Sequence, residues 1–198
     1  MIEDGLHDVP PGKVAMVVTH LEMRAPASFR PAELRDGVTF ERIEPDVARY
    51  RALFDRVGRD WLWFARRVMP ETELAEILTD PRVTFHTLRM AGQDMALLEL
   101  DFRKEGECEL AYFGLAPELI GAGAGRYLMN QAIDLAWREP IARLHVHTCT
   151  LDSPQALPFY IRSGFVPYRQ QIEVENDPRL TGDLPVDAAP HVPLFRAP

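Results

Sequence analysis

The sequence contains few cysteines and no long apolar run, and each absence excludes a class of protein. Its only cysteines are Cys108 and Cys149, too few for a disulfide scaffold and without the spacing of a metal site. No apolar stretch reaches the roughly 18 residues that a membrane-spanning helix needs. Glu3 and Asp4 stand where a signal peptide would carry a basic region. We therefore expect a cytoplasmic protein with no metal and no membrane partner.

Positive charge is also scarce. The chain has 30 acidic and 22 basic side chains, which gives a formal net charge of -8. Nucleic acids and anionic lipids are bound by basic surfaces, so we expect no nucleic-acid partner. An acidic protein suits a cationic substrate slightly better, although many unrelated enzymes have a similar charge.

What is present is ordinary for one folded domain. The length of 198 residues suits a single domain, and 46% hydrophobic with 26% charged residues argues against disorder. No internal repeat or low-complexity linker divides the chain. We therefore expect residues 1–198 to form one domain.

Hydrophobic spacing predicts a mixed α/β order of elements. The expected strands are 14–18, 83–90, 95–102, 109–115, 143–150 and 166–175. The expected helices are 45–68 with a break at Gly58, 71–78, one that follows a glycine-rich loop and ends near Arg138, and one after Ser153. Turns at Gly92 and Gly106 separate the strands between 83 and 115, which indicates an antiparallel meander. The proline-rich tail, 177–198, is expected to be extended coil.

The last expected helix carries mixed signals at its ends. Ser153 can act as its N-cap, and Pro154 suits the first helical position. Gly164 suits the C-terminal end. Pro158 fits the helix poorly, so its first turn is either irregular or begins later.

The most informative segment is a glycine-rich loop. A strand ending near Leu115 leads into Gly121, Gly123 and Gly125, and a helix follows. Small residues let backbone N–H groups approach an anion, and the helix N-terminus adds partial positive charge, so a diphosphate is the natural ligand. A turn that merely permits close packing explains the glycines about as well.

Two other phosphate-binding motifs do not match this loop. A Walker loop requires Lys and then Ser or Thr, but Gly125 is followed by Arg126 and Tyr127. A Rossmann loop follows the first strand of a βαβ unit, whereas this loop follows several hairpin strands.

The segment resembles the first motif of the GNAT acetyltransferase superfamily, Gln/Arg-x-x-Gly-x-Gly/Ala after an apolar-x-Pro step. Leu115-Ala116-Pro117 and the glycines at 121, 123 and 125 match it. Ile120 stands where the family usually has Arg or Gln, which removes a side chain that often holds the diphosphate. Arg126 could partly replace it.

A second GNAT motif follows at the correct separation. Ala156, Tyr160 and Gly164-Phe165 match Ala-x-x-x-Tyr-x-x-x-Gly-Phe, while Ser153 replaces the usual Asn. The resemblance covers about 83–168, and Trp61-Leu62-Trp63 also looks like an uncharacterised bacterial subgroup of the family. It implies a mixed, mainly antiparallel twisted sheet, flanked by helices and splayed between its central strands.

The resemblance also implies a reaction. An N-acetyltransferase of this family moves an acetyl group from acetyl-CoA, its co-substrate, to an amine on a small molecule or peptide. The implied contacts to acetyl-CoA come from Phe113, Leu115, Ala116, Gly121, Ala122, Gly123, Ala124, Gly125, Arg126, Ser153, Ala156 and Phe159. Paired sheets or helices could join two copies as a homodimer.

Catalytic roles follow from the same resemblance. Tyr160 is expected to protonate the leaving thiolate, because a phenol stays protonated at neutral pH; a core tyrosine is the alternative. The backbone N–H of Leu115 is expected to stabilise the developing oxyanion. The base is expected to be Glu99, ahead of Glu109 and His147.

The acceptor amine is expected to lie among aromatic side chains. Trp61, Trp63, Tyr112 and His147 are the candidates, since aromatic walls suit a cationic or apolar group. Core packing is an alternative role for at least one tryptophan, and His147 could equally be structural. Two rival functions stay open: an acyl-CoA sensor that has lost catalysis, and a generic nucleotide-phosphate binding protein.

Overall fold

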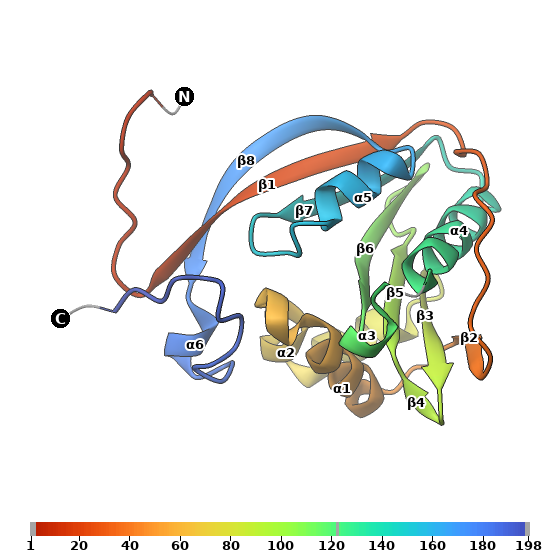
Figure 1. The fold of residues 1–198 in the computed structure, drawn as a ribbon, viewed down its shortest axis with the longest axis horizontal. Coiled ribbons are helices and arrows are strands. Elements are labelled where there is room, and N and C mark those ends of the chain that lie inside the picture. Colours follow the sequence, from red (N-terminus) through yellow and green to blue (C-terminus); the bar gives the residue numbers. More distant parts are fainter. Residues whose placement is uncertain (1–2, 122, 197–198) are drawn as a thin grey trace.

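The computed structural model describes residues 3–121 and 123–196, and its centre is one eight-stranded sheet (Figure 1). The strands lie in the order β2-β3-β5-β6-β7-β1-β8, and β4 also pairs with β3. Their bounds are β1 (Lys13–Met23), β2 (Val38–Arg42), β3 (Val83–Met90), β4 (Gln93–Asp94), β5 (Ala96–Asp101), β6 (Glu107–Leu115), β7 (Arg143–Cys149) and β8 (Val166–Asn176). All pairs are antiparallel except β6 and β7, so the sheet is mixed and mainly antiparallel, as the sequence predicts.

The sheet splays between β6 and β7. These parallel strands pair only from Glu107 opposite Arg143 to Glu109 opposite His145. Beyond that point β6 continues to Leu115 and β7 to Cys149 without pairing to each other. Figure 1 shows the two strands diverging. The expected splay between the central strands is therefore confirmed.

Helices cover both faces of the sheet. Their bounds are α1 (Val47–Gly58), the 3-10 turn η1 (Arg59–Trp61), α2 (Ala65–Val68), α3 (Glu71–Thr79), the 3-10 turn η2 (Pro117–Leu119), α4 (Ala124–Trp137), α5 (Ala156–Arg162) and α6 (Pro178–Thr181). Leu128 and Ala132 on α4 are fully buried against Leu98 and Leu100 of β5. Leu97 points the opposite way, into the cluster that α1 and α3 bury. Alternation along β5 thus fills both cores.

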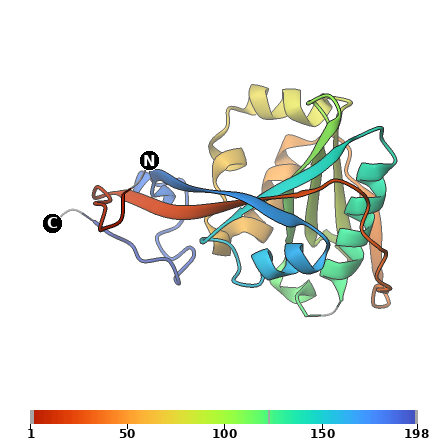
Figure 2. The same ribbon diagram turned by 90° about the horizontal axis from the view of Figure 1, so that it is seen from above.

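The first strand differs from its expected length and place. It runs over 11 residues instead of 14–18, and it lies between β7 and β8. In Figure 2, β1 and β8 run together as a long arm toward α6. The short strand β2 follows a proline-containing stretch and is not predicted at all; it forms because β3 offers it a free edge.

The helix after the second motif begins later than the expected cap. Its N-cap is Gln155 and its first residue is Ala156, so Pro158 falls in the first turn, where a missing N–H is tolerated. Ser153 accepts a hydrogen bond from the backbone of Gln155 at 3.3 Å and closes a turn ahead of the helix. Gly164 follows the helix with φ 102°, which agrees with its expected terminal position.

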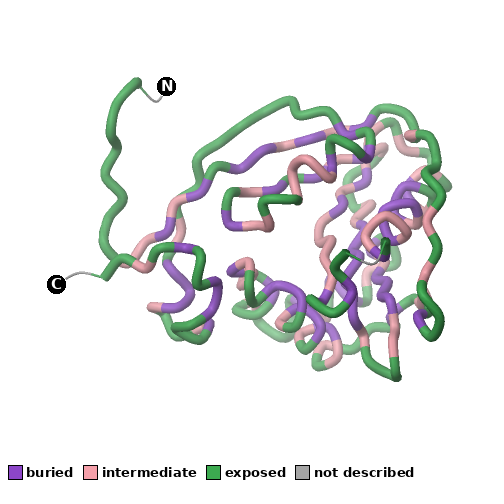
Figure 3. Tube along the Cα trace, viewed as in Figure 1, coloured by how far each residue is buried: buried purple, intermediate pink, exposed green. Residues whose placement is uncertain are grey.

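The expected extended tail is wrong for residues 177–196. Asp177 and Arg179 form a buried ion pair at 2.7 Å, and Arg179 also donates to the carbonyl of Val192 at 2.9 Å. Leu184 and Val192 are buried with Val14 of β1. Proline-rich backbone lacks donors for regular structure, and the Arg179 guanidinium satisfies its carbonyl groups instead. Figure 3 shows buried segments in this tail beside the exposed strand β8.

Candidate active site

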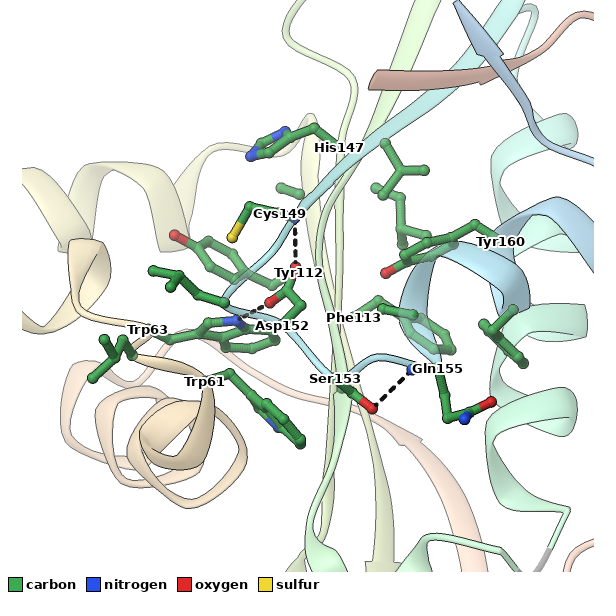
Figure 4. A pocket seen from close by; sticks show the side chains of 18 of the residues that line it. Trp61, Trp63, Tyr112, Phe113, His147, Cys149, Asp152, Ser153, Gln155 and Tyr160 are labelled. Carbon is green, nitrogen blue, oxygen red and sulfur yellow. Dashed lines mark hydrogen bonds between the residues drawn. The ribbon is translucent and has the colours of Figure 1, made fainter. Parts of the chain in front are cut away.

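The splay between β6 and β7 opens into a cavity of about 410 Å³. Its walls come from β6, β7, the segment before α5, α5 itself and the turn around η1, together with Glu173 and Glu175 of β8. Figure 4 shows Tyr160 and Phe113 on one side and Trp61 and Trp63 on the other. One cavity therefore joins the glycine-loop region to the aromatic side chains.

The glycine loop adopts backbone that requires glycine. Gly121 and Gly123 have φ of 84° and 78°, in the left-handed region. Gly123 is the N-cap of α4 and offers no side chain to cap the first-turn amides. At Gly125 a Cβ would lie 3.5 Å from Leu115 and 4.0 Å from the ring of Phe159, which is ordinary van der Waals contact with the cavity wall. Ala122 lies outside the described residues.

The backbone direction of β6 follows from one hydrogen bond. Ala116 N–H donates to the carbonyl of Met95 at 2.8 Å, toward β5. Neighbouring residues of a strand point their amides to opposite edges, so the N–H groups of Leu115 and Phe113 point toward the splay. Both residues line the cavity, whereas Ala116 is fully buried and is not part of its lining.

Tyr160 faces the cavity from α5. Its side chain is 6% exposed and packs against Phe113, Phe159 and Phe165. Within the described chain its hydroxyl has no hydrogen-bond partner, and Figure 4 shows it directed into the opening. Burial, followed by the charge of Asp152, raises the pKa of Tyr160 far above its ordinary value. The phenol therefore stays protonated at neutral pH.

Ala156 and Phe159 also line the cavity from α5, and Ser153 lines it from the preceding turn. The guanidinium of Arg126 lies 5.1 Å from the centroid of the Phe159 ring. Burial, then repulsion from Arg30 and Arg162, lowers the pKa of Arg126. Cationic side chains therefore gather around the start of α4.

Trp61 and Trp63 lie on either side of a strained residue. Leu62 has φ 52°, a left-handed conformation that costs a non-glycine residue about 1–2 kcal/mol. Trp63 is wedged tightly, because a Cβ at Gly58 would approach its side chain to 2.4 Å. Trp63 Nε1 donates to Asp152 at 3.1 Å. Both tryptophans line the cavity, although Trp63 also packs against a core cluster.

Tyr112 lines the cavity beside Trp63, with ring centroids 5.2 Å apart. Burial raises the pKa of Tyr112 to about 12. The guanidinium of Arg66 lies 5.4 Å from the Tyr112 centroid. The sequence-predicted aromatic residues are therefore gathered at one end of the cavity.

His147 lines the same cavity from β7. Its Nδ1 lies 3.5 Å from Oε1 of Glu109 on β6, near the point where the strands separate. Hydrogen bonding to Glu109 raises the pKa of His147, with the charges of Glu109, Asp152 and Glu173 adding to the rise against an opposing effect of burial. The same contact lowers the pKa of Glu109. His147 is half exposed, so it can exchange protons with solvent.

Glu99 is not brought to the cavity. Its side chain is completely buried, whereas the expected base must reach the substrate. One carboxylate oxygen accepts from Arg66 at 2.6 Å and the other accepts from the Tyr50 hydroxyl. Burial raises the pKa of Glu99, and Arg66 and Tyr50 oppose that rise. Because Glu99 is fully buried and is not part of the cavity lining, it does not reach a substrate amine, and its expected role as base is corrected.

Sequence patterns did not identify three carboxylates near the cavity. Asp152 accepts hydrogen bonds from Trp63, from the Thr148 hydroxyl at 2.6 Å and from the backbone N–H of Cys149 at 3.0 Å. Its position directly before the second motif was the only signal for it. Glu173 and Glu175 share one face of β8 by alternation. Which face that is depends on pairing with β1, which lies more than 150 residues away along the chain.

The described residues contain neither a candidate metal site nor a candidate membrane-spanning helix. No group of three or more His, Cys, Asp or Glu side chains in 3–121 and 123–196 is arranged to hold a metal ion. Among the described helices, none has the length and apolar character needed to cross a bilayer.

Solved structures share this fold at low sequence identity. A functionally unknown conserved protein from Staphylococcus epidermidis superposes with a TM-score of 0.62 and 14% identity, over 84% of this chain and 64% of that one. A putative GNAT acetyltransferase from Novosphingobium aromaticivorans gives 0.57 and 19%, over 87% and 70%. An aminoglycoside acetyltransferase from an uncultured soil metagenomic sample gives 0.54 and 14%, over 66% and 90%. The chain thus spans less than two thirds of the first protein's length.

Comparison of the sequence with known proteins assigns the chain to a family. No curated protein matches the chain. The model of the acetyltransferase (GNAT) family matches residues 50–165, which is more than half of the chain and includes both the glycine loop and Tyr160. The chain belongs to the GNAT acetyltransferase family.

Proposed function

We propose that this chain transfers the acetyl group of acetyl-CoA to a primary amine by direct attack. The observation that carries the proposal is Tyr160, a buried residue whose hydroxyl has no partner in the described chain and faces the cavity bounded by the glycine-loop end of β6. The fold that the chain shares with an aminoglycoside acetyltransferase is compatible with an amine acceptor.

The residues around the splay fit acetyl-CoA. Left-handed backbone at Gly121 and Gly123 and uncapped amides at the start of α4 suit a diphosphate. The edge of β6 at Phe113 and Leu115 presents backbone groups to the opening, which suits the amides of a pantetheine arm. Arg126 would add charge beside the diphosphate, while Phe159, Ala156 and Ser153 would contact the bound molecule from α5 and its approach.

Each reacting atom has a residue suited to it. The bound thioester supplies an activated acetyl carbon, and the neutral amine attacks it, forming a C–N bond as the C–S bond breaks. The Leu115 N–H donates to the carbonyl oxygen as negative charge develops there. Tyr160 O–H gives its proton to the departing sulfur. The surplus proton on nitrogen passes to a base.

His147 is the base that we assign in place of Glu99. It lines the cavity, can exchange protons with solvent, and is oriented by Glu109. A carboxylate behind an imidazole fixes its orientation and stabilises the protonated ring. His20 lies beside it, with ring centroids 5.7 Å apart.

The assignment of His147 makes a prediction about pH. Activity requires neutral imidazole, so kcat/KM should rise with pH through the raised pKa of His147. Glu109→Gln removes the charge that raises it, so the acidic limb should move toward lower pH by about one unit. The measurement is kcat/KM against pH at fixed ionic strength. Glu107→Gln is the control because Glu107 faces His145, and it should leave the limb in place. An unmoved limb in Glu109→Gln would remove His147 from the reaction.

Ligand-dependent stability tests the choice of acetyl-CoA. A ligand at about a hundred times its Kd stabilises a protein by ~2.7 kcal/mol, which raises the Tm of a chain this size by about 5–10 °C. We expect this rise with acetyl-CoA and none with ATP or NAD at the same concentration. Equal stabilisation by all three would favour a generic nucleotide-phosphate binding protein.

An acyl-CoA sensor of the same fold is the second candidate. Ile120 and Ser153 depart from the family motifs, and Ile120 is 59% exposed at the loop. Tight acetyl-CoA binding without acetylation of any amine above the rate of hydrolysis would favour the sensor.

A further inference from the structure

Two carboxylates in the cavity lining, those of Glu173 and Glu175, have no assigned role in the proposed reaction. We call Glu173 and Glu175 of β8 the acidic rim. The β1–β8 register places Glu173 opposite Met16 and Glu175 opposite Val14. Met16 lines the cavity, and directly opposed residues of an antiparallel pair share a face. Both carboxylates therefore lie on the cavity side of the sheet arm and form part of its lining.

The acidic rim has no cationic partner within the described chain. None of the ion pairs among residues 3–121 and 123–196 includes Glu173 or Glu175. The one arginine in the cavity lining is Arg162, which lies on α5 close enough to Arg126 to repel it, at the glycine-loop end. The other basic side chain in the lining is His147, which is held by Glu109 and whose pKa the charge of Glu173 also raises.

Apolar side chains line the same cavity as the acidic rim. Met16, Leu62 and Phe64 line it together with Trp61. The folded tail fixes this wall, because Leu184 and Val192 pack with Met16 and Leu62. The reacting end is marked independently by Tyr160, a residue more than nine-tenths buried whose hydroxyl lacks a partner in the described chain and points into the cavity. The cavity thus presents a proton donor, an apolar stretch and two free carboxylates.

We propose that the acceptor is a diamine or longer polyamine, whose reacting amine lies near Tyr160 and His147 while a second ammonium binds the acidic rim. The proposal rests on the proposed acetyltransferase function. The reacting nitrogen gives up its proton and receives the acetyl group. The distal ammonium stays protonated and forms ion pairs with Glu173 and Glu175, and the hydrocarbon between them lies along the apolar wall.

The pairing of β1 with β7 and β8 sets the distance that such a substrate must span. His147 on β7 pairs with His20 on β1, and Glu173 on β8 pairs with Met16, four residues from His20 along β1. The strands β7 and β8 lie on either side of β1, so they are two strand spacings apart. Strand spacing of ~4.8 Å and a rise of ~3.3 Å per residue place the two Cα atoms on the order of 15 Å apart. Both side chains extend into the space and shorten the gap. We therefore expect a long diamine to bind better than ethylenediamine.

Paired amines test the proposal. Octylamine and diaminooctane with terminal amines have the same chain length and differ in the distal charge. We expect kcat/KM for diaminooctane to exceed that for octylamine by about fivefold or more, since exposed ion pairs contribute up to ~1 kcal/mol each. Added salt should reduce the difference, because exposed charges are screened beyond ~10 Å at moderate ionic strength.

Variants locate the effect. The double variant Glu173→Gln/Glu175→Gln should abolish the preference for diaminooctane, with both amines compared at a pH above the acidic limb because loss of the Glu173 charge also lowers the pKa of His147. Glu105→Gln, an exposed carboxylate in the turn before β6, is the matched control and should keep the preference. A wild-type enzyme that uses both amines equally, or a double variant that keeps the preference, would overturn the proposal.

Direct binding separates this inference from the proposed function. Trp61 and Trp63 line the cavity, so their fluorescence should respond to an amine even without turnover. Tighter binding of diaminooctane than octylamine in the wild type, lost in the double variant, supports the acidic rim even if neither amine is acetylated. In that case only the acetyltransferase assignment fails. Equal binding of the two amines overturns the acidic rim, whatever the activity.

Discussion

Tyr160→Phe is expected to lower kcat for acetyl transfer by about a hundredfold, within the range of general acid catalysis. The departing sulfur must leave as a free thiolate once the phenol is gone. Burial holds the pKa of Tyr160 high, so the wild-type hydroxyl is protonated across the working pH range. The ring itself stays, with its contacts to Phe113, Phe159 and Phe165, so acetyl-CoA affinity should change little.

The measurement is single-turnover transfer at saturating acetyl-CoA and amine, together with the Kd for acetyl-CoA. Tyr127→Phe is the control, since Tyr127 lies on α4, is not part of the cavity lining and loses the same hydroxyl. Unchanged single-turnover rates in Tyr160→Phe would place the tyrosine outside the chemistry. A large loss of acetyl-CoA affinity would instead make it a binding residue.

Gly123→Val is expected to weaken acetyl-CoA binding by about a hundredfold. Gly123 has φ 78° at the start of α4, a conformation that valine adopts only under strain. Relaxing that strain turns the first-turn amides away from the diphosphate, and charge-assisted hydrogen bonds contribute ~1.5–3 kcal/mol each. The added methyl groups also occupy space beside the loop. Isothermal titration with acetyl-CoA measures the loss.

Backbone strain alone must be separated from the loss of a ligand contact. Gly106 has φ 72° in the turn before β6, at the end of that strand opposite the loop. Gly106→Val should therefore lose a similar amount of stability, about 1–2 kcal/mol, while keeping its acetyl-CoA affinity. Wild-type affinity in folded Gly123→Val would reject the loop as the diphosphate site.

Local patterns were sufficient for most of the fold. The three strands from Val83 to Leu115 and the helix after the glycine loop have strong periodicity and clear turns, and the structure has them within a few residues. The order of strands in the sheet was less accessible. The position of β1 between β7 and β8 depends on pairing with residues at the far end of the chain, and no local signal reports it.

The structure of the C-terminal tail also could not be predicted from local sequence patterns. Its prolines predict extended coil, but the single buried Arg179 replaces regular backbone hydrogen bonds with contacts to several carbonyl groups. A sequence pattern cannot reveal that an arginine will be buried, because arginine is usually exposed. The apolar residues of the tail then complete the cluster with β1.

Some residues of the candidate site could be predicted from the sequence, and others could not. Of the residues with motif spacing, Leu115, Gly125 and Tyr160 line one cavity, whereas Ala116, Gly121 and Gly123 are not part of its lining. The choice among Glu99, Glu109 and His147 needed tertiary structure. Alternation along β5 predicts which residues share a face with Glu99, but it does not predict what packs against that face. In the structure α1 and α2 cover it, and they bring Tyr50 and Arg66 to the two carboxylate oxygens.

Isotopic labelling tests the central claim most directly. The protein is incubated with acetyl-CoA labelled in the acetyl group and with a panel of primary amines that includes diaminooctane, and the label is followed by mass spectrometry. We expect labelled N-acetyl amine and free CoA in equal amounts, with little labelled acetate. Label found only in acetate or in unconsumed acetyl-CoA, with every amine unmodified, would contradict the account.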